Sequence, residues 1–152
     1  MKRLFRSVAI ALLALGLFAG PAYAHVNTND ITGSTWRDSY GFSSTTFYGN
    51  GTYQCGHNHP YIEIRTTLQQ EVPDGSAIYH DVSDTNTKVK HDPGNCPISR
   101  QVSRTCSTDD QLSHRFRVKV RVISKDANRN VTGSETVYRG QQQFRINCFA
   151  QP

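Results

Sequence analysis

Residues 114–124 read His-Arg-Phe-Arg-Val-Lys-Val-Arg-Val-Ile-Ser, and this stretch decides the fold class. From Arg115 to Val122, apolar and basic side chains alternate without a break, which is the period of a half-buried β-strand. Its apolar side is rich in valine, a β-branched residue that packs well on a sheet face. Its other side carries four cations, Arg115, Arg117, Lys119 and Arg121. The stretch therefore predicts a β-strand with one packed face and one basic face.

The four cations repel one another, so water or other groups must solvate or pair them. One interpretation is an ordinary solvated outer face, since Lys and Arg are exposed in most proteins. A second interpretation gives the row a function, either as an anion-binding surface or as the basic lining of a barrel interior. The sequence leaves open whether the row points outward or inward.

The rest of the chain also indicates β-structure. Short runs rich in Val, Ile, Thr, Tyr and Phe recur at regular spacing, and no long amphipathic helix is evident. In residues 43–55, Asn50-Gly51 stands between two such runs, which predicts a two-residue β-hairpin turn. We expect an all-β fold, a single antiparallel β-barrel or sandwich of about eight short strands.

Residues 1–24 have the pattern of a secretory signal peptide. Lys2, Arg3 and Arg6 precede an apolar run that is too short to span a bilayer, and Ala22-Tyr23-Ala24 resembles a cleavage site. Cleavage would leave residues 25–152 as one all-β domain, secreted or periplasmic and without a membrane span. Three of the 17 basic residues leave with the signal peptide, so 14 remain against 12 acids, a net charge of +2. That small charge argues against a general nucleic-acid binder.

The four cysteines of the exported chain predict disulfides. An even number of cysteines in an oxidising compartment favours two bridges, and three pairings are possible. We expect Cys96 to pair with Cys106 in a local loop and Cys55 to pair with Cys148, joining an early strand to the last. Zinc ligation is disfavoured because the chain contains no C-x-x-C spacing.

The segment Gly33-Ser34-Thr35-Trp36, followed by residues 46–53 (Thr-Phe-Tyr-Gly-Asn-Gly-Thr-Tyr), resembles the start of lipocalin-like small barrels. The family motif is G-x-W, and this chain has one residue more between Gly33 and Trp36. The resemblance implies a barrel that binds a small ligand or inhibits an enzyme. It also implies that Trp36 closes the base of the barrel against a basic residue near the last strand, here Arg145.

Two further patterns suggest metal sites. Gly51, His57, His59 and Glu63 have spacing similar to the first motif of cupin barrels, and two His and one carboxylate suit a divalent transition metal. The match is incomplete, because Gln70 stands where the motif ends in Gly and Pro60 interrupts the strand. Separately, His25 would become the amino-terminal residue and could chelate copper through its amine and imidazole.

Taken together, these features favour a secreted or periplasmic binding protein over an enzyme, with no cofactor expected. The expected ligand is a small molecule or an anionic partner held by Arg115, Arg117, Lys119 and Arg121, with Trp36 closing the barrel. The alternatives from another class are a cupin-like metal-dependent enzyme that uses His57, His59 and Glu63, and a copper site at His25.

Overall fold

The computed structural model describes residues 25–38, 44–55, 59–91, 96–108 and 112–149. The predicted signal peptide, residues 1–24, lies outside them. A short 3-10 turn, η1 (Thr28–Asp30), is followed by nine strands in the described part of the chain, so the all-β prediction is confirmed. The Asn27 side chain caps this turn by accepting a hydrogen bond of 2.9 Å from the Asn29 amide. None of the helical structure described is long and apolar enough to cross a membrane.

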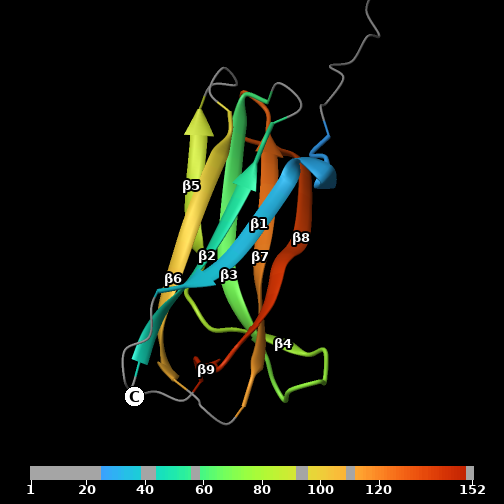
Figure 1. The fold of residues 1–152 in the computed structure, drawn as a ribbon. Coiled ribbons are helices and arrows are strands. Elements are labelled where there is room, and N and C mark those ends of the chain that lie inside the picture. The colour runs from blue at the N-terminus through green and yellow to red at the C-terminus, as the bar shows by residue number, and fades with distance from the viewer. Residues whose placement is uncertain (1–24, 39–43, 56–58, 92–95, 109–111, 150–152) are drawn as a thin grey trace, which may run out of the picture.

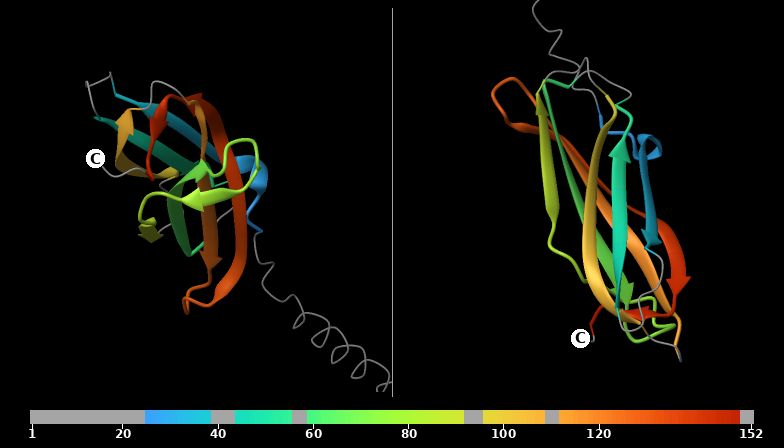
Figure 2. Two further views of the ribbon diagram at one scale, coloured as in Figure 1. Left: turned by 90° about the horizontal axis from the view of Figure 1, so that it is seen from below. Right: turned by 60° about the vertical axis from the view of Figure 1, so that its left-hand side comes forward.

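The strands form two antiparallel sheets that pack face to face along the long axis of the molecule (Figure 1; Figure 2). The first sheet has the order β1-β2-β6-β9, with bounds Ile31–Arg37, Ser44–Tyr53, Ile98–Thr108 and Ile146–Asn147. The second has the order β4-β3-β7-β8, with bounds Tyr79–Asp81, Tyr61–Glu71, His114–Lys125 and Val131–Phe144. Strand β5 (Asn86–His91) also pairs with β3, beyond the end of β4.

The core lies between the two sheets and follows from the period-two pattern of their strands. In β7, the inward side chains Phe116, Val118, Val120 and Val122 are all fully buried. Across the core, the Phe47 ring of β2 lies 4.5 Å from the Phe116 ring, measured between ring centroids. The two sheets therefore enclose a filled interior made of two apolar clusters, and the alternation in residues 115–122 supplies side chains to both.

The Asn50-Gly51 hairpin prediction is wrong, because β2 runs straight through this dipeptide. Its partner strands continue on both sides, with Ser34 of β1 and Gln101 of β6 each opposite Asn50. The two glycines of β2, Gly49 and Gly51, both face the core. A Cβ atom on Gly51 would lie 2.7 Å from Val120 Cγ2 in the opposite sheet. Glycine is thus needed here so that side chains of the opposite sheet can pack against the β2 backbone, rather than for a turn.

The edges of the two sheets approach each other on both sides of the sandwich. On one side, Thr35 of β1 donates a hydrogen bond through its hydroxyl to the Gly140 carbonyl of β8. Arg139 Nε donates to the Ile31 carbonyl at 3.3 Å on the same side. On the other side, the Asn86 amide of β5 donates to the Gln101 carbonyl of β6 at 2.9 Å. These contacts curl the sheets toward a barrel, although the strand pairing keeps two separate sheets.

All four cysteines form disulfides, but with a pairing different from the one expected. The bridges are Cys55–Cys96 and Cys106–Cys148. Cys96 lies two residues before the extended strand β6 and Cys106 lies near the end of that strand, and ten residues of extended chain span about 33 Å. A disulfide requires Cα atoms within about 7 Å, so these two cysteines must bond to other partners. One bridge therefore ties each end of β6 to a neighbouring segment.

Candidate functional site

The four cations of β7 point away from the core. Their neighbours Phe116, Val118, Val120 and Val122 are buried between the sheets, and side chains alternate along a strand. Arg115 and Arg121 are exposed, whereas Arg117 and Lys119 are half-buried among their surface neighbours. The row is therefore part of an outer surface, formed by the outward side chains of β4, β3, β7 and β8, and we refer to it as the basic face.

Carboxylates from β3 and β4 form ion pairs with two of the four cations. Arg115 Nη1 lies 3.8 Å from the Glu71 carboxylate, and Lys119 Nζ lies 3.6 Å from the Asp81 carboxylate. Both cations are about 40 % exposed, so each of these ion pairs contributes little to stability. Their effect is to reduce the repulsion between like charges on β7.

Glu63 lies at the far end of the basic face and is held by closer ion pairs than Glu71 and Asp81 are. Its buried carboxylate accepts a hydrogen bond of 2.6 Å from Lys125 Nζ and another from Arg65 Nε. The hydrogen bond from Lys125 lowers the pKa of Glu63, and Arg65 adds to the effect while burial opposes it. Both carboxylate oxygens thus already bind cations of this chain, a role different from the metal ligation that its sequence spacing suggests.

Arg117 occupies the centre of the basic face in a clamp of two tyrosines. Its Cζ atom lies 3.7 Å from the ring centroid of Tyr79 in β4 and 4.0 Å from that of Tyr138 in β8. These distances place the guanidinium between the two rings, where both cation–π contacts are favourable. Arg117 Nε donates to Gln69 Oε1 at 2.8 Å, and the same Gln69 side chain donates to Asp81 at 2.6 Å. The guanidinium is therefore fixed in orientation by contacts from three strands.

The hydrogen bond of Arg117 uses only its Nε. Within the described parts of the chain, neither Nη atom has a hydrogen-bond partner. The Nη groups of an arginine present paired N–H donors that match a carboxylate, sulfate or phosphate. The arrangement thus holds an arginine ready to bind an oxyanion.

Arg121 adds a second cation for which the described residues supply no carboxylate partner. Its Nε donates to the Ser134 hydroxyl at 3.0 Å, and Arg65 lies directly opposite it on β3. The outward side chains described on the basic face then comprise six cations and three carboxylates, a net charge of +3. They are Arg65, Arg115, Arg117, Lys119, Arg121 and Lys125, against Glu63, Glu71 and Asp81. This one face therefore has a larger positive charge than the +2 of residues 25–152 as a whole.

The clamp was missed by sequence reasoning because its parts come from three separate segments. Tyr79 lies on a strand of only three residues, and Tyr138 lies opposite Lys119 in the register of β8 with β7. Neither tyrosine belongs to a motif. Only the strand pairing brings their rings to the two sides of Arg117.

The lipocalin-like role of Trp36 is not what the structure shows. Trp36 lies on the outer surface of the first sheet and is 37 % exposed, so it does not close the interior. Its ring stacks on Tyr48 at 5.5 Å between centroids with an interplanar angle of 11°. Arg145 is an exposed residue between β8 and β9. The sheet of Trp36 is the opposite one from the basic face, so Trp36 and the four cations do not form one site.

The predicted metal sites remain predictions. His57 lies outside the described residues, His59 is buried, and Glu63 pairs with Lys125 and Arg65. The described residues contain no group of three or more His, Cys, Asp or Glu side chains arranged to hold a metal ion. His25 is exposed and precedes Val26, whose side chain is buried in the core.

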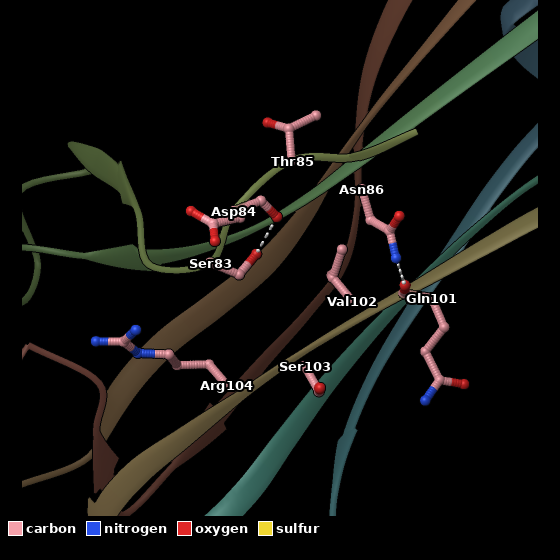
Figure 3. Close-up of a pocket in the computed structure, with 8 residues that line it drawn as sticks. All are labelled: Ser83, Asp84, Thr85, Asn86, Gln101, Val102, Ser103 and Arg104. Atoms are coloured by element: carbon pink, nitrogen blue, oxygen red, sulfur yellow. Dashed lines mark hydrogen bonds between the residues drawn. The ribbon is translucent and has the colours of Figure 1, made fainter. Parts of the chain in front are cut away.

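A polar groove lies at the open seam between β6 and residues 83–86 (Figure 3). Its volume is about 400 Å³, and Asp84, Asn86, Gln101, Ser103 and Arg104 are among the residues that line it. A second hollow of about 370 Å³ shares Asp84 and Arg104 and extends toward Phe149. The groove is lined mainly by hydroxyl, amide and charged groups.

Comparison with protein-family models, with curated proteins and with solved structures finds no match for this chain.

Proposed function

We propose that this chain is a secreted or periplasmic binding protein, without catalytic activity of its own, that binds an anionic ligand or partner on the basic face. The observation that carries the proposal is the Arg117 clamp, in which Tyr79 and Tyr138 fix a guanidinium whose Nη donors lack partners among the described residues. Fixing these donors in advance reduces the entropy that binding would cost.

The ligand chemistry follows from the donors. A guanidinium edge favours a planar or tetrahedral oxyanion, namely a carboxylate, sulfate or phosphate group. Arg121 lies on the same side of β7 four residues away, about 13 Å along the strand. A ligand with several anionic groups would engage both arginines, so a polyanionic chain fits the face better than a single small anion does.

An outer binding surface fits this fold better than the internal cavity that a lipocalin-like barrel would have. Phe47, Phe116 and Phe144 pack ring against ring between the sheets. Gly51 and Val120 bring the two sheets too close together to leave room even for an added methyl group. The described interior is thus a packed core, which supports binding on the outside.

The experiment is a titration of the mature protein with a soluble polyanion, dextran sulfate, at increasing salt concentrations. Affinity should fall as salt rises, because the contacts are electrostatic and exposed. Arg117→Gln should weaken binding about tenfold or more, since a charge-assisted hydrogen bond contributes roughly 1.5–3 kcal/mol. Arg117→Lys should lose most of the same affinity, because lysine keeps the charge but not the paired donors or the stacking.

A matched control removes one charge elsewhere. Lys88 is an exposed lysine on β5, opposite Ile64, and belongs to the other side of that sheet. Lys88→Gln should change the affinity for dextran sulfate less than about twofold. Equal losses in Lys88→Gln and Arg117→Gln, or an affinity that does not depend on salt, would contradict the proposal.

A further inference from the structure

The outer surface of the first sheet has a composition very different from that of the basic face. The outward positions of β1, β2 and β6 are occupied by Ser, Thr, Asn and Gln, together with Trp36 and Tyr48. No charged side chain projects from these outward positions in the described residues. We refer to this surface as the neutral face.

The two aromatic rings of the neutral face are held in place. Trp36 and Tyr48 are directly opposite each other in the pairing of β1 with β2, and their rings are stacked. The Tyr48 hydroxyl donates a hydrogen bond of 2.9 Å to the Asp38 carboxylate, which fixes the orientation of the tyrosine. On the far side of Tyr48 the next strand has the small residue Ser103. The ring face of Tyr48 that points away from Trp36 is therefore not covered by a large neighbour in its own row.

Ser103 also belongs to the rim of the polar groove (Figure 3). Trp36, Tyr48 and Ser103 thus lie in one line across three strands, and the groove continues that line beyond β6. Adjacent strands are about 4.8 Å apart, so the aromatic pair and the groove lie within about 10 Å of each other. Ser103 is therefore shared by the row of the aromatic pair and the rim of the groove.

The groove forms because β4 and β5 both pair with the same edge of β3, one after the other. β4 pairs with residues 69–71 of β3 and β5 with residues 61–66, so the connection 82–85 leaves the sheet between them. Asn86 then bonds to Gln101 of β6 and closes the seam above the groove. The groove is therefore a consequence of strand pairing, and its position is fixed by the fold.

Two opposite charges stand in the groove among uncharged donors and acceptors. Asp84 and Arg104 both line it, and Nε of Arg104 is buried without a hydrogen-bond partner among the described residues. A carboxylate beside a guanidinium suits a pair of neighbouring hydroxyl groups, since one accepts from a hydroxyl and the other donates to it.

We propose that the neutral face and its groove bind an uncharged polysaccharide chain. The C–H groups on one side of a sugar ring would stack on the open ring face of Tyr48, with Trp36 stacked behind it, because an aromatic face is negative and apolar. The hydroxyl groups of the next sugar would bind Ser103, Asp84 and Arg104. This site is separate from the basic face and does not depend on the function proposed for it.

Other occupants fit this surface less well. A nucleic acid needs cations for its phosphates, and the neutral face presents none outside the groove. The centre of a protein–protein interface is usually apolar, whereas here hydroxyl and amide side chains surround a single aromatic pair. A chain of uncharged hydroxyl-bearing rings is the partner whose chemistry matches all three parts: the aromatic pair, the polar strands and the groove.

The test uses Trp36 as a reporter, because it is the only tryptophan in the chain. The mature protein is titrated with four neutral soluble polymers: dextran, laminarin, hydroxyethyl cellulose and galactomannan. Binding should produce a saturable change in tryptophan emission, and the same polymer should retard the protein in a native affinity gel. Since no ion pair with the ligand is involved, the affinity should change less than about twofold between low and high salt.

Variants then locate the site on the gel. Trp36→Ala should weaken binding about tenfold or more, as expected for an aromatic anchor. Ser103→Ile should have a similar effect, because its bulk fills the space between Tyr48 and the groove while keeping a good strand former on an outward position. Ser99→Ile is the matched control. It makes the same change on the same strand and face, about 13 Å along the strand from the proposed sugar path, and should alter the affinity less than about twofold.

Three results would overturn the proposal. In the first, none of the four polymers changes the emission of Trp36 or retards the protein. In the second, Trp36→Ala and Ser103→Ile bind as the parent protein does, with circular dichroism showing that both are folded. In the third, Ser99→Ile weakens binding as much as Ser103→Ile does, which would show that the polysaccharide does not cross the strands along the row of Trp36, Tyr48 and Ser103.

Discussion

Gly140 of β8 offers a sharp test of how the two sheets meet. It has a φ of +63°, a conformation in which a side chain is strained. A Cβ atom at this position would lie 2.8–2.9 Å from the backbone of Ser34 and Thr35 in β1. Backbone atoms cannot move aside as a flexible side chain can. The Gly140 carbonyl also accepts the hydrogen bond from the Thr35 hydroxyl that joins the sheet edges.

The expected cost of Gly140→Ala can be estimated from these three effects. A positive φ costs alanine roughly 1–2 kcal/mol. Forcing extra volume against packed atoms costs about 1–3 kcal/mol, and weakening one hydrogen bond costs about 0.5–1.5 kcal/mol. The total is about 3–6 kcal/mol, a large part of the 5–15 kcal/mol that typically stabilises a domain.

Gly75 is the matched control, because it has a φ of +79° but nothing within 4 Å of its added Cβ atom. Gly75→Ala should therefore cost only the conformational strain, roughly 1–2 kcal/mol. The measurement is urea unfolding of the oxidised mature protein, followed by circular dichroism, with the free energy of unfolding extrapolated to water. If Gly140→Ala destabilises the protein no more than Gly75→Ala does, the close contact between β1 and β8 is refuted.

Three further stability predictions follow from the described contacts. Glu63→Gln should lower the free energy of unfolding by about 1–2 kcal/mol at neutral pH, because it removes the charge that Lys125 binds. The folded-state pKa of Glu63 is lowered, so this stabilisation is present above its unfolded pKa of about 4.3 and is lost as the pH falls through the folded value. In urea titrations at several pH values, the free energies of unfolding of the parent protein and the variant should therefore converge in acid. The paired substitution of Cys106→Ser and Cys148→Ser should cost about 4 kcal/mol, the loop-entropy value for a separation of 42 residues. In the parent protein, peptide mapping without reduction should recover Cys106 and Cys148 in one linked pair. Gly51→Ala should cost about 1–3 kcal/mol through overlap with the opposite sheet, and a thermal midpoint equal to that of the parent protein would refute the close approach.

The basic strand was predicted well because its signal is local. Strict alternation over residues 115–122 is enough to define a strand and its two faces. Which way the basic side pointed was open, since a barrel lining and an outer face have the same period. The side chains at 116, 118, 120 and 122 are fully buried between the two sheets, so the alternating basic side chains of β7 must point outward.

The hairpin prediction at Asn50-Gly51 was wrong because glycine occurs both in tight turns and where two sheets pack closely. Glycine allows the positive φ of a tight turn, and it also allows two sheets to approach closely. In this chain the second use holds, and Phe47, Gly49, Gly51 and Tyr53 all face the core at a period of two. The same alternation that identified β7 was therefore present in β2, with two of its apolar positions occupied by glycine.

The disulfide pairing and the tyrosine clamp could not be read from the sequence for a common reason. Both depend on which strands are neighbours, and period-two patterns do not specify strand order. Cys106 meets Cys148 because β9 returns beside the end of β6. Tyr138 reaches Arg117 because β8 pairs with β7 in one register, and a shift of one residue would turn the ring to the other face.

The two proposed binding surfaces lie on opposite outer faces of one sandwich, and this placement makes them separable. Sheets in a sandwich pack about 10 Å apart, so a ligand on the basic face does not reach Trp36 through the packed core. Exposed charges further apart than the Debye length of about 8 Å are largely screened at physiological salt. Arg117→Gln should therefore change polyanion binding without altering tryptophan emission, and Trp36→Ala should leave the salt dependence of polyanion binding unchanged. The small net charge of residues 25–152 is compatible with this arrangement, because the outward cations of β3 and β7 are gathered on one sheet while the described outward positions of β1, β2 and β6 carry none.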